Sequence, residues 1–238
     1  MSAHGLDMDD GPALPVRRLT LRGGAGVDLW LAGPSGAGAV PEHLWNTLSG
    51  TEKNRADRFL RPEDRALFVM TRGILRVLLG TATGIAADAI TFAEGPFGKP
   101  YLSQIHGPFF NVSHAGSFGL IGLSKSRPIG VDIERMRLTG DELNVARRFF
   151  SAAEYRALES PEKDAMLSAF YKIWTCKEAV LKACGAGISD HLKHFSVEVT
   201  KDGFAIHPEP EWMPPALAAI SAEPVAVPSG YVGCCALA

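Results

Sequence analysis

The clearest pattern of hydrophobic and polar positions lies between residues 170 and 185. Apolar side chains recur there at helical spacing and form one stripe of a predicted helix, namely Phe170, Ile173, Trp174, Val180, Leu181 and Cys184. Lys177 falls inside this stripe, and Glu178 and Lys182 lie on its flank, one turn apart. Charges beside a buried face need partners. The helix therefore carries either snorkelling lysines with a stabilising Glu–Lys pair or part of an ionic site. We interpret Lys177 as a structural ion-pair partner.

A second segment, residues 128–134, alternates between apolar and polar positions as a strand does. Its apolar residues share one face, and Asp132 and Glu134 project together from the other. Two neighbouring carboxylates raise each other's pKa unless a cation lies between them, and hard oxygen ligands of this kind suit Mg²⁺. The alternative is the solvated face of an antiparallel strand. A metal site requires a further ligand, for which Glu178 is the candidate.

The remaining pattern predicts two similar sets of elements, each with one long helix and a small antiparallel sheet. The predicted helices are 41–48, a long one over 52–79 announced by the capping box Ser49-x-x-Glu52, 141–149, 152–158, and a long one that starts at Ser160-Pro161. The predicted strands are 27–32, 90–92, 109–113, 117–123, 128–134, 195–200, 204–207 and 231–236. This order indicates the α+β class. Residues 1–16 are expected to form a flexible leader.

Composition narrows the class of protein without identifying its chemistry. The chain has 238 residues, of which 46% are hydrophobic and 21% charged, as in ordinary globular proteins. A net charge of −2 argues against a nucleic-acid partner. The N-terminal sequence does not resemble a signal peptide, no apolar run approaches the roughly 18 residues of a membrane helix, and the 4 cysteines lack paired spacing. We expect a cytoplasmic monomer without a membrane partner.

Two further segments carry polar residues in or beside turns. Asn-Val-Ser-His at 111–114 precedes a strand-like run, and Gly-Lys-Pro at 98–100 predicts a rigid turn. Taken singly, Ser113 and His114 are turn residues and Lys99 is a solvated charge. A Ser–His nucleophilic pair is disfavoured because neighbours on a strand point to opposite faces and no Gly-x-Ser-x-Gly elbow is present.

Together these segments resemble the signature blocks of a known family. Residues 111–114, 130–134 and 174–185 are similar, in order and spacing, to three blocks of the 4′-phosphopantetheinyl transferases. Residues 98–100 and 147–155 resemble further blocks of the larger, Sfp-type branch. The similarity covers residues 45–205 and rests on five ordered blocks.

The resemblance implies a particular architecture. Sfp-type enzymes have an α+β fold of two pseudo-symmetric halves, each a long helix packed on a small antiparallel sheet, with the active site in the cleft between them. In this chain the halves would span residues 17–125 and 126–238, as one intimate unit after the leader at 1–16.

The resemblance also implies an activity, namely Mg²⁺-dependent transfer of the 4′-phosphopantetheine group from coenzyme A to a serine of an apo acyl or peptidyl carrier protein, which leaves 3′,5′-ADP. Asp132, Glu134 and Glu178 would hold Mg²⁺, and Lys182 would contact a phosphate oxygen. Asp132, Glu178 and Lys182 are the candidate catalytic residues, with Glu178 as the base. Whether the acceptor serves nonribosomal peptide, polyketide or fatty-acid synthesis stays open.

Coenzyme A contacts are implied as well, and they fall on Lys99, Pro100, Ser113, His114 and Lys182. For the 3′-phosphate the family carries basic residues near the start of the first long helix. Here Glu52 occupies one such position, so Arg55, Arg58 and Arg72 are the candidates.

Two other functions are compatible with the residues taken alone. One is a Mg²⁺-dependent pyrophosphate hydrolase, and the other is a non-catalytic module that binds coenzyme A or a carrier protein. Retention of all three carboxylates together with Lys182 argues against the second.

Overall fold

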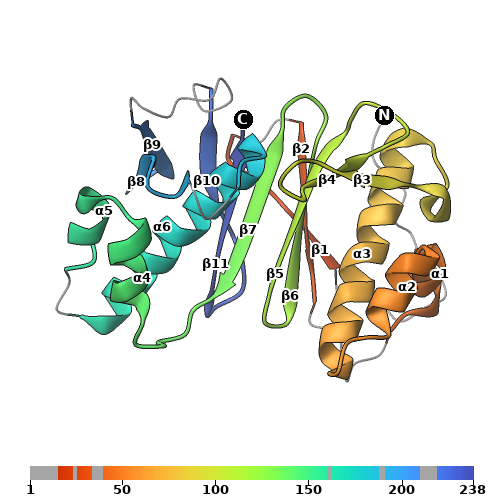
Figure 1. The fold of residues 1–238 in the computed structure, drawn as a ribbon, viewed down its shortest axis with the longest axis horizontal. Coiled ribbons are helices and arrows are strands. Elements are labelled where there is room, and N and C mark those ends of the chain that lie inside the picture. The colour runs from red at the N-terminus through yellow and green to blue at the C-terminus, as the bar shows by residue number, and fades with distance from the viewer. Residues whose placement is uncertain (1–15, 24–25, 34–39, 160–161, 188–190, 210–218) are drawn as a thin grey trace.

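The structure is a computed structural model that describes residues 16–23, 26–33, 40–159, 162–187, 191–209 and 219–238. Figure 1 shows strands at the centre of the molecule and a group of helices at each end. This combination of helices and antiparallel sheets confirms the predicted α+β class. The division into halves at 17–125 and 126–238, and their pseudo-symmetry, stays a prediction.

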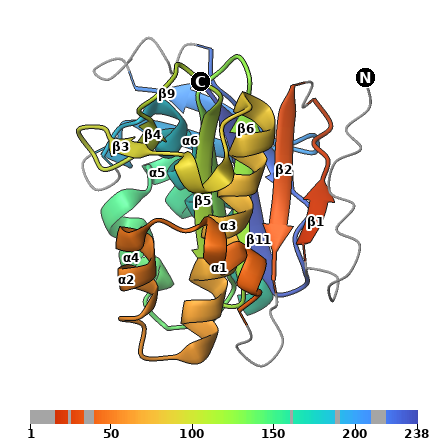
Figure 2. The same cartoon turned by 90° about the vertical axis from the view of Figure 1, so that its right-hand side faces the viewer.

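The first part of the chain combines helices with a four-stranded antiparallel sheet. The helices are α1 (Glu42–Thr47), α2 (Gly50–Ala56) and α3 (Pro62–Thr83), followed by a 3₁₀ turn, η2, at Ala87–Ala89. The strand order is β1 (Val16–Leu19), β2 (Val27–Ala32), β6 (Phe118–Ser124) and β5 (Phe109–Ala115). Figure 2 shows β1 and β2 at one side of the molecule. A separate hairpin pairs β3 (Phe92–Glu94) with β4 (Pro100–Leu102).

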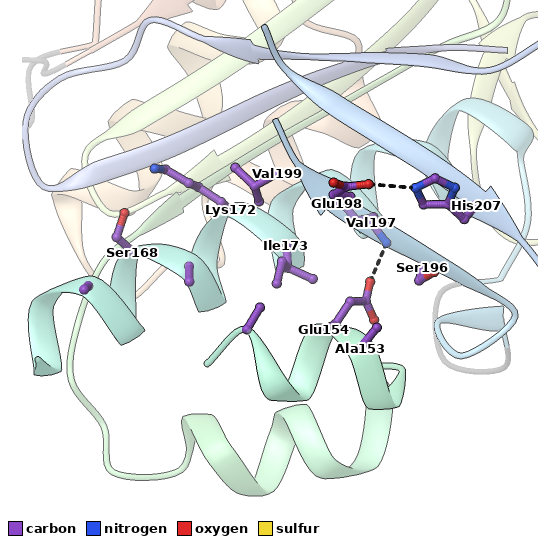
Figure 3. A pocket seen from close by; sticks show the side chains of 13 residues that line it. Ala153, Glu154, Ser168, Lys172, Ile173, Ser196, Val197, Glu198, Val199 and His207 are labelled. Atoms are coloured by element: carbon purple, nitrogen blue, oxygen red, sulfur yellow. Dashed lines mark hydrogen bonds and ion pairs between the residues drawn. The ribbon is translucent and has the colours of Figure 1, made fainter. Parts of the chain in front are cut away.

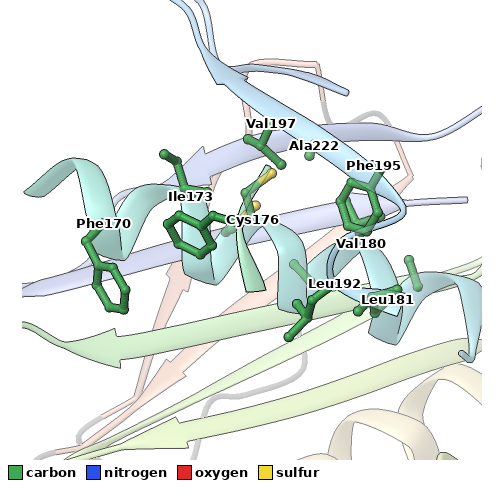
Figure 4. Close-up of a cluster of buried hydrophobic side chains, with 14 of the residues drawn as sticks. Phe170, Ile173, Cys176, Val180, Leu181, Leu192, Phe195, Val197 and Ala222 are labelled. Carbon is green, nitrogen blue, oxygen red and sulfur yellow. The ribbon is translucent and has the colours of Figure 1, made fainter. Parts of the chain in front are cut away.

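The second part has a five-stranded antiparallel sheet covered by helices. Its order is β7 (Ile129–Arg135), β11 (Tyr231–Leu237), β10 (Ser221–Val225), β9 (Phe204–Pro208) and β8 (Phe195–Val199). The helices are α4 (Glu142–Phe149), α5 (Ala152–Arg156) and α6 (Lys163–Cys184). The apolar stripe of α6 forms the core against this sheet (Figure 4), where Phe170, Ile173 and Val180 are buried. Each such side chain contributes about 1.5–3 kcal/mol by leaving water.

The two sheets meet where β5 lies beside β7. One edge of β7 pairs with β11, so its other N–H groups need acceptors from elsewhere. Side chains of β5 supply them: Asn111 Oδ1 accepts from the Val131 N–H at 2.9 Å, and Ser113 Oγ accepts from the Ile133 N–H at 3.4 Å. The Asn-x-Ser spacing therefore joins the sheets, because residues two apart face the same way.

The first long helix differs from the prediction. The capping box is present, since Ser49 Oγ accepts from the Glu52 N–H, but it begins the short helix α2, which ends at Ala56. The long helix α3 begins at Pro62. Proline suits the first helical position because it lacks an N–H, and it keeps Arg61 extended. The predicted single helix over 52–79 was therefore wrong.

Several element boundaries also differ. The strands β1, β4 and β10 were not predicted, and Val16, the last residue of the expected leader, already lies in β1. The rest of that leader lies outside the described residues. The helix α6 begins at Lys163 with Glu162 as its N-cap. The predicted start of this helix at Ser160-Pro161 also lies outside the described residues.

One helix among the described residues, α3, is long and apolar enough to cross a membrane. Arg72 and Arg76 interrupt its apolar sequence, so α3 is not an unbroken apolar run of the kind that the prediction excluded. In addition, 56% of the apolar window is buried inside the fold, and a core helix passes the same test. Met70, Ile74 and Leu79 of α3 belong to the core of the first part of the chain.

Candidate active site

The contact between α6 and β7 is unusually close at Gly130. A Cβ atom at this position would lie 2.0 Å from the Ala179 carbonyl oxygen and 2.4 Å from the Ala183 nitrogen. Any side chain would therefore push α6 away from the sheet. With glycine here, the turn of α6 that carries Glu178 and Lys182 lies over the strand that carries Asp132.

The ammonium group of Lys182 lies between the carboxylates of Asp132 and Glu178. Its Nζ lies 2.6 Å from Asp132 Oδ1 and 3.1 Å from Glu178 Oε2. From β5, the Ser113 hydroxyl donates to the same Asp132 Oδ1 at 2.8 Å. Asp132 is buried, and the other three side chains are partly exposed. The structure thus brings together four predicted site residues from three separate segments.

The cluster holds more negative charge than one ammonium group balances. Burial, followed by the charges of Asp132 and Glu178, raises the pKa of Glu134 to about 7. Burial and Asp132 also raise the pKa of Glu178, although Lys182 partly offsets them. Burial opposes the charge of Lys182, but the two acids outweigh it, so that the pKa of Lys182 rises.

The donor chemistry of this cluster fits a hard divalent cation. Asp132 Oδ2 is buried and has no hydrogen-bond partner in the part of the chain that the structure describes. Carboxylate oxygens are the ligands that Mg²⁺ prefers. Within the described residues, no three acidic, histidine or cysteine side chains form a metal-binding group, and the Lys182 ammonium lies between two of the predicted ligands. The fit therefore rests on oxygen type and surplus charge.

Two adjoining cavities of about 250 and 420 Å³ lie between α2, α3 and the β4–β5 region. Together they have the size of a typical small-molecule site. Both are lined by Arg55, Phe68, Arg72, Glu94 and Pro100, the first also by Asn111 and His114, and the second also by Glu52 and Arg76. Four predicted coenzyme A contacts therefore share one polar region.

Glu52 has a clear structural partner in this region. Its Oε2 accepts from Arg76 Nε at 2.8 Å, and its Oε1 lies 3.5 Å from Arg72 Nε. Arg76 is buried and also donates to the carbonyls of Ala87 and Ile90. Sequence reasoning missed Arg76, although an arginine inside the apolar stripe of α3 is the same signal that marked Lys177.

The other four predicted contacts, Arg58, Lys99, Ser113 and Lys182, line neither cavity. Arg58 is exposed. The Lys99 ammonium instead donates to the backbone carbonyls of Ile129, Lys182 and Ala183.

Lys177 is confirmed as a structural ion-pair partner. Its Nζ lies 3.0 Å from Glu154 Oε1, and both side chains are buried. Beside this pair lies a larger cavity of about 670 Å³ between α5, α6 and β8 (Figure 3). It contains none of the predicted site residues, and the Glu154 carboxylate on its wall accepts from the Val197 N–H.

Comparison with known proteins decides the family. Residues 128–213 match the family description "4′-phosphopantetheinyl transferase superfamily", and residues 40–125 match "4′-phosphopantetheinyl transferase, N-terminal". A putative 4′-phosphopantetheinyl transferase, slr0495, of Synechocystis is 40% identical over 69% of this chain and 67% of its own. The 4′-phosphopantetheinyl transferase HetI of Nostoc is 39% identical over 67% of this chain and 68% of its own length. The 4′-phosphopantetheinyl transferase Sfp of Bacillus subtilis is 31% identical over 68% of this chain and 71% of its own length.

The chain belongs to the 4′-phosphopantetheinyl transferase superfamily. It is therefore a transferase, of the branch that the sequence resemblance indicated. The two matched regions meet between residues 125 and 128, where β6 ends and β7 begins. In this transferase the candidate cluster takes Ser113 from the first matched region and its acids and Lys182 from the second.

Proposed function

We propose that this transferase moves the 4′-phosphopantetheine group of coenzyme A onto a serine of an apo acyl or peptidyl carrier protein, with Mg²⁺, and releases 3′,5′-ADP. The observation that carries the proposal is the Lys182 ammonium between the carboxylates of Asp132 and Glu178, beside Ser113. Phosphoryl transfer depends mainly on positioning and on neutralising charge, for which such a cluster is suited.

The bond changes balance without another reactant. The serine oxygen forms a bond to the phosphorus that bears the pantetheine, and the bond from that phosphorus to the 3′,5′-ADP oxygen breaks. Glu178 takes the serine proton, directly or through a water. Lys182 stabilises the negative charge of the phosphate oxygens, and Asp132 orients the Lys182 ammonium.

Mg²⁺ would be held by Asp132, Glu134 and Glu178. When bound, it supplies positive charge against the pyrophosphate. The unpartnered Asp132 Oδ2 and the raised pKa values of Glu134 and Glu178 support this assignment, because both indicate carboxylates in need of a cation.

The nucleotide end of coenzyme A would occupy the two polar cavities. Arg72 and Arg76 are paired with Glu52, whereas Arg55 is exposed on the cavity wall with its guanidinium over the Phe68 ring. Arg55 is therefore the foremost candidate for the 3′-phosphate, with His114 and Pro100 lining the same space. We place the site at the junction of the proposed halves 17–125 and 126–238.

The deciding experiment incubates the protein with coenzyme A, Mg²⁺ and an apo carrier protein, and weighs the carrier by mass spectrometry. We expect the carrier to gain one phosphopantetheine group, together with release of 3′,5′-ADP. Glu198, an exposed acid of β8 whose carboxylate contacts His207 and none of the cluster residues, provides the matched control: Glu178→Gln should lose the mass gain and Glu198→Gln should keep it.

The alternatives give different results in the same mixture. A pyrophosphate hydrolase would release product from coenzyme A without any carrier. A binding module would leave both the carrier and coenzyme A unchanged. Either result would overturn the proposal.

A further inference from the structure

The ammonium of Lys99 lies among backbone oxygens. Its Nζ donates to the carbonyl of Lys182 at 2.6 Å, of Ile129 at 3.0 Å and of Ala183 at 3.3 Å. Three acceptors match the three hydrogens of an ammonium group. The protein backbone therefore uses the whole donor capacity of this side chain.

The three carbonyls belong to the two elements that carry the candidate active site. Ile129 is the first residue of β7, and Lys182 and Ala183 lie in the last turn of α6, which ends at Cys184. The last carbonyls of a helix lack partners within it and carry the negative end of its dipole, so a positive charge is favoured there. Lys99 reaches them from the β3–β4 turn, 83 residues before Lys182 in the chain.

Lys182 is thus held through both its backbone and its side chain. Its backbone oxygen accepts from Lys99, and its side-chain ammonium contacts Asp132 and Glu178. The same turn also lies close to the segment that follows α6, because a Phe97 ring carbon lies 3.1 Å from where a Cβ of Gly187 would be.

We propose that Lys99 is a positioning residue that holds the C-terminal turn of α6 against β7 and the β3–β4 turn, and so keeps Lys182 and Glu178 in register with Asp132. It touches no reacting atom. Burial lowers the pKa of Lys99 to about 8, so the group is still mostly protonated at neutral pH. The kinetic part of this inference rests on the proposed function, whereas the structural part does not.

The test compares Lys99→Met, which keeps length but removes the donors, with Lys99→Arg and with Lys201→Met, a control at an exposed lysine of the β8–β9 turn. We expect Lys99→Met to lower kcat by about 10- to 100-fold, because small misplacements of catalytic groups have effects of this size, with KM for coenzyme A almost unchanged. Hydrogen exchange at the amides of residues 183–187 should become faster. Lys99→Arg should keep most of the wild-type kcat and most of the wild-type protection from exchange. Lys201→Met should change neither kcat nor the exchange rate.

Three results would overturn the inference. Unchanged hydrogen exchange in Lys99→Met would show that Lys99 does not hold the helix end. A raised KM with normal kcat would assign Lys99 to direct contact with coenzyme A. If the activity of Lys99→Met falls only in proportion to its folded fraction, Lys99 supports the fold and does not position the catalytic groups. If the wild-type protein modifies no carrier, the proposed function fails, and the exchange measurement still tests the contact.

Discussion

Two lysines on the same helix, α6, form ion pairs that differ in burial and in how well their charges are matched. Lys177 contacts Glu154 at 3.0 Å and donates to the carbonyls of Leu192 and Phe195. The Glu154 oxygens also accept from the N–H groups of Val197 and Ser151. One positive and one negative charge meet there, and every oxygen and donor proton has a partner.

The Lys182 cluster leaves charge and hydrogen-bonding capacity unmatched. One ammonium faces Asp132 and Glu178. Burial, together with the charges of these two acids, raises the pKa of the nearby Glu134 to about 7. Asp132 Oδ2 is buried without a partner in the described structure. An ion pair that only supports the fold has no reason to leave such groups unsatisfied. The difference teaches that a buried charge indicates a functional site when some of the charges and hydrogen-bonding groups around it have no partner.

The largest expected effect separates the two clusters by activity. Glu178→Gln should lower kcat about 100- to 1000-fold, because the base is lost and one preorganised charge is removed. The melting temperature should stay the same or rise, since surplus negative charge is relieved. Carrier modification under saturating substrates, with thermal unfolding of the same samples, measures both.

Glu154→Gln is the crossed control for that variant. It should lower the melting temperature and leave kcat per folded molecule nearly normal. Near-normal turnover of Glu178→Gln, or equal loss of activity in both variants, would contradict the assignment of the two clusters.

The second effect concerns stability at the matched pair. Lys177→Met should lower the free energy of unfolding by about 3–5 kcal/mol, because Glu154 would be left as a buried charge without a cation. Denaturant titration measures it, with Lys172→Met, at an exposed lysine of the same helix, as the control. A loss in Lys177→Met no larger than in that control would mean that the pair is already hydrated or that Glu154 becomes protonated at little cost.

The third effect uses the cation itself. At 100 times its dissociation constant, Mg²⁺ should raise the free energy of unfolding by about 2.7 kcal/mol in the wild-type protein, by mass action. Asp132→Asn should lose most of this rise, whereas Lys177→Met should keep it. Calorimetry with and without Mg²⁺ measures the difference. An equal rise in all three proteins would place the cation elsewhere.

The sequence was most informative where pattern and chemistry coincided within one segment. The helix around 170–184 and the strand around 129–135 were predicted because a clear apolar period defined one face of each, and their charged residues stood out against it. The break before α3 could have been predicted as well, because Pro62 is a signal for a first helical position. The strand β4 has only 3 residues, too few to show a period, and Pro224 within β10 is a residue that argues against a strand.

Contacts between distant segments were beyond sequence reasoning unless the family supplied them. Asn111 accepts from a backbone N–H of β7, which shows only once β5 and β7 lie side by side. Lys99 was expected at coenzyme A, but its partners are carbonyls at the end of a helix far along the chain. Backbone acceptors have no sequence signature, so neither role could be inferred from residue type.

The smallest expected effect tests whether Ser113 belongs to the unmatched cluster or to coenzyme A. Its hydroxyl donates to Asp132 Oδ1 and accepts from the Ile133 N–H and, at 3.5 Å, from Lys182 Nζ. Ser113→Ala removes all three contacts, and loss of the bond to the Asp132 carboxylate alone should cost about 1.5 kcal/mol. If that cost falls on the alignment of Asp132 with Lys182, kcat should drop roughly tenfold with KM for coenzyme A unchanged. Ser151→Ala is the matched change at the other cluster, where the hydroxyl caps α5, and it should cost about 1 kcal/mol of stability with normal kcat. A raised KM in Ser113→Ala would instead assign its hydroxyl to the substrate phosphates, and the Asp132 contact would then be the arrangement of the free enzyme alone.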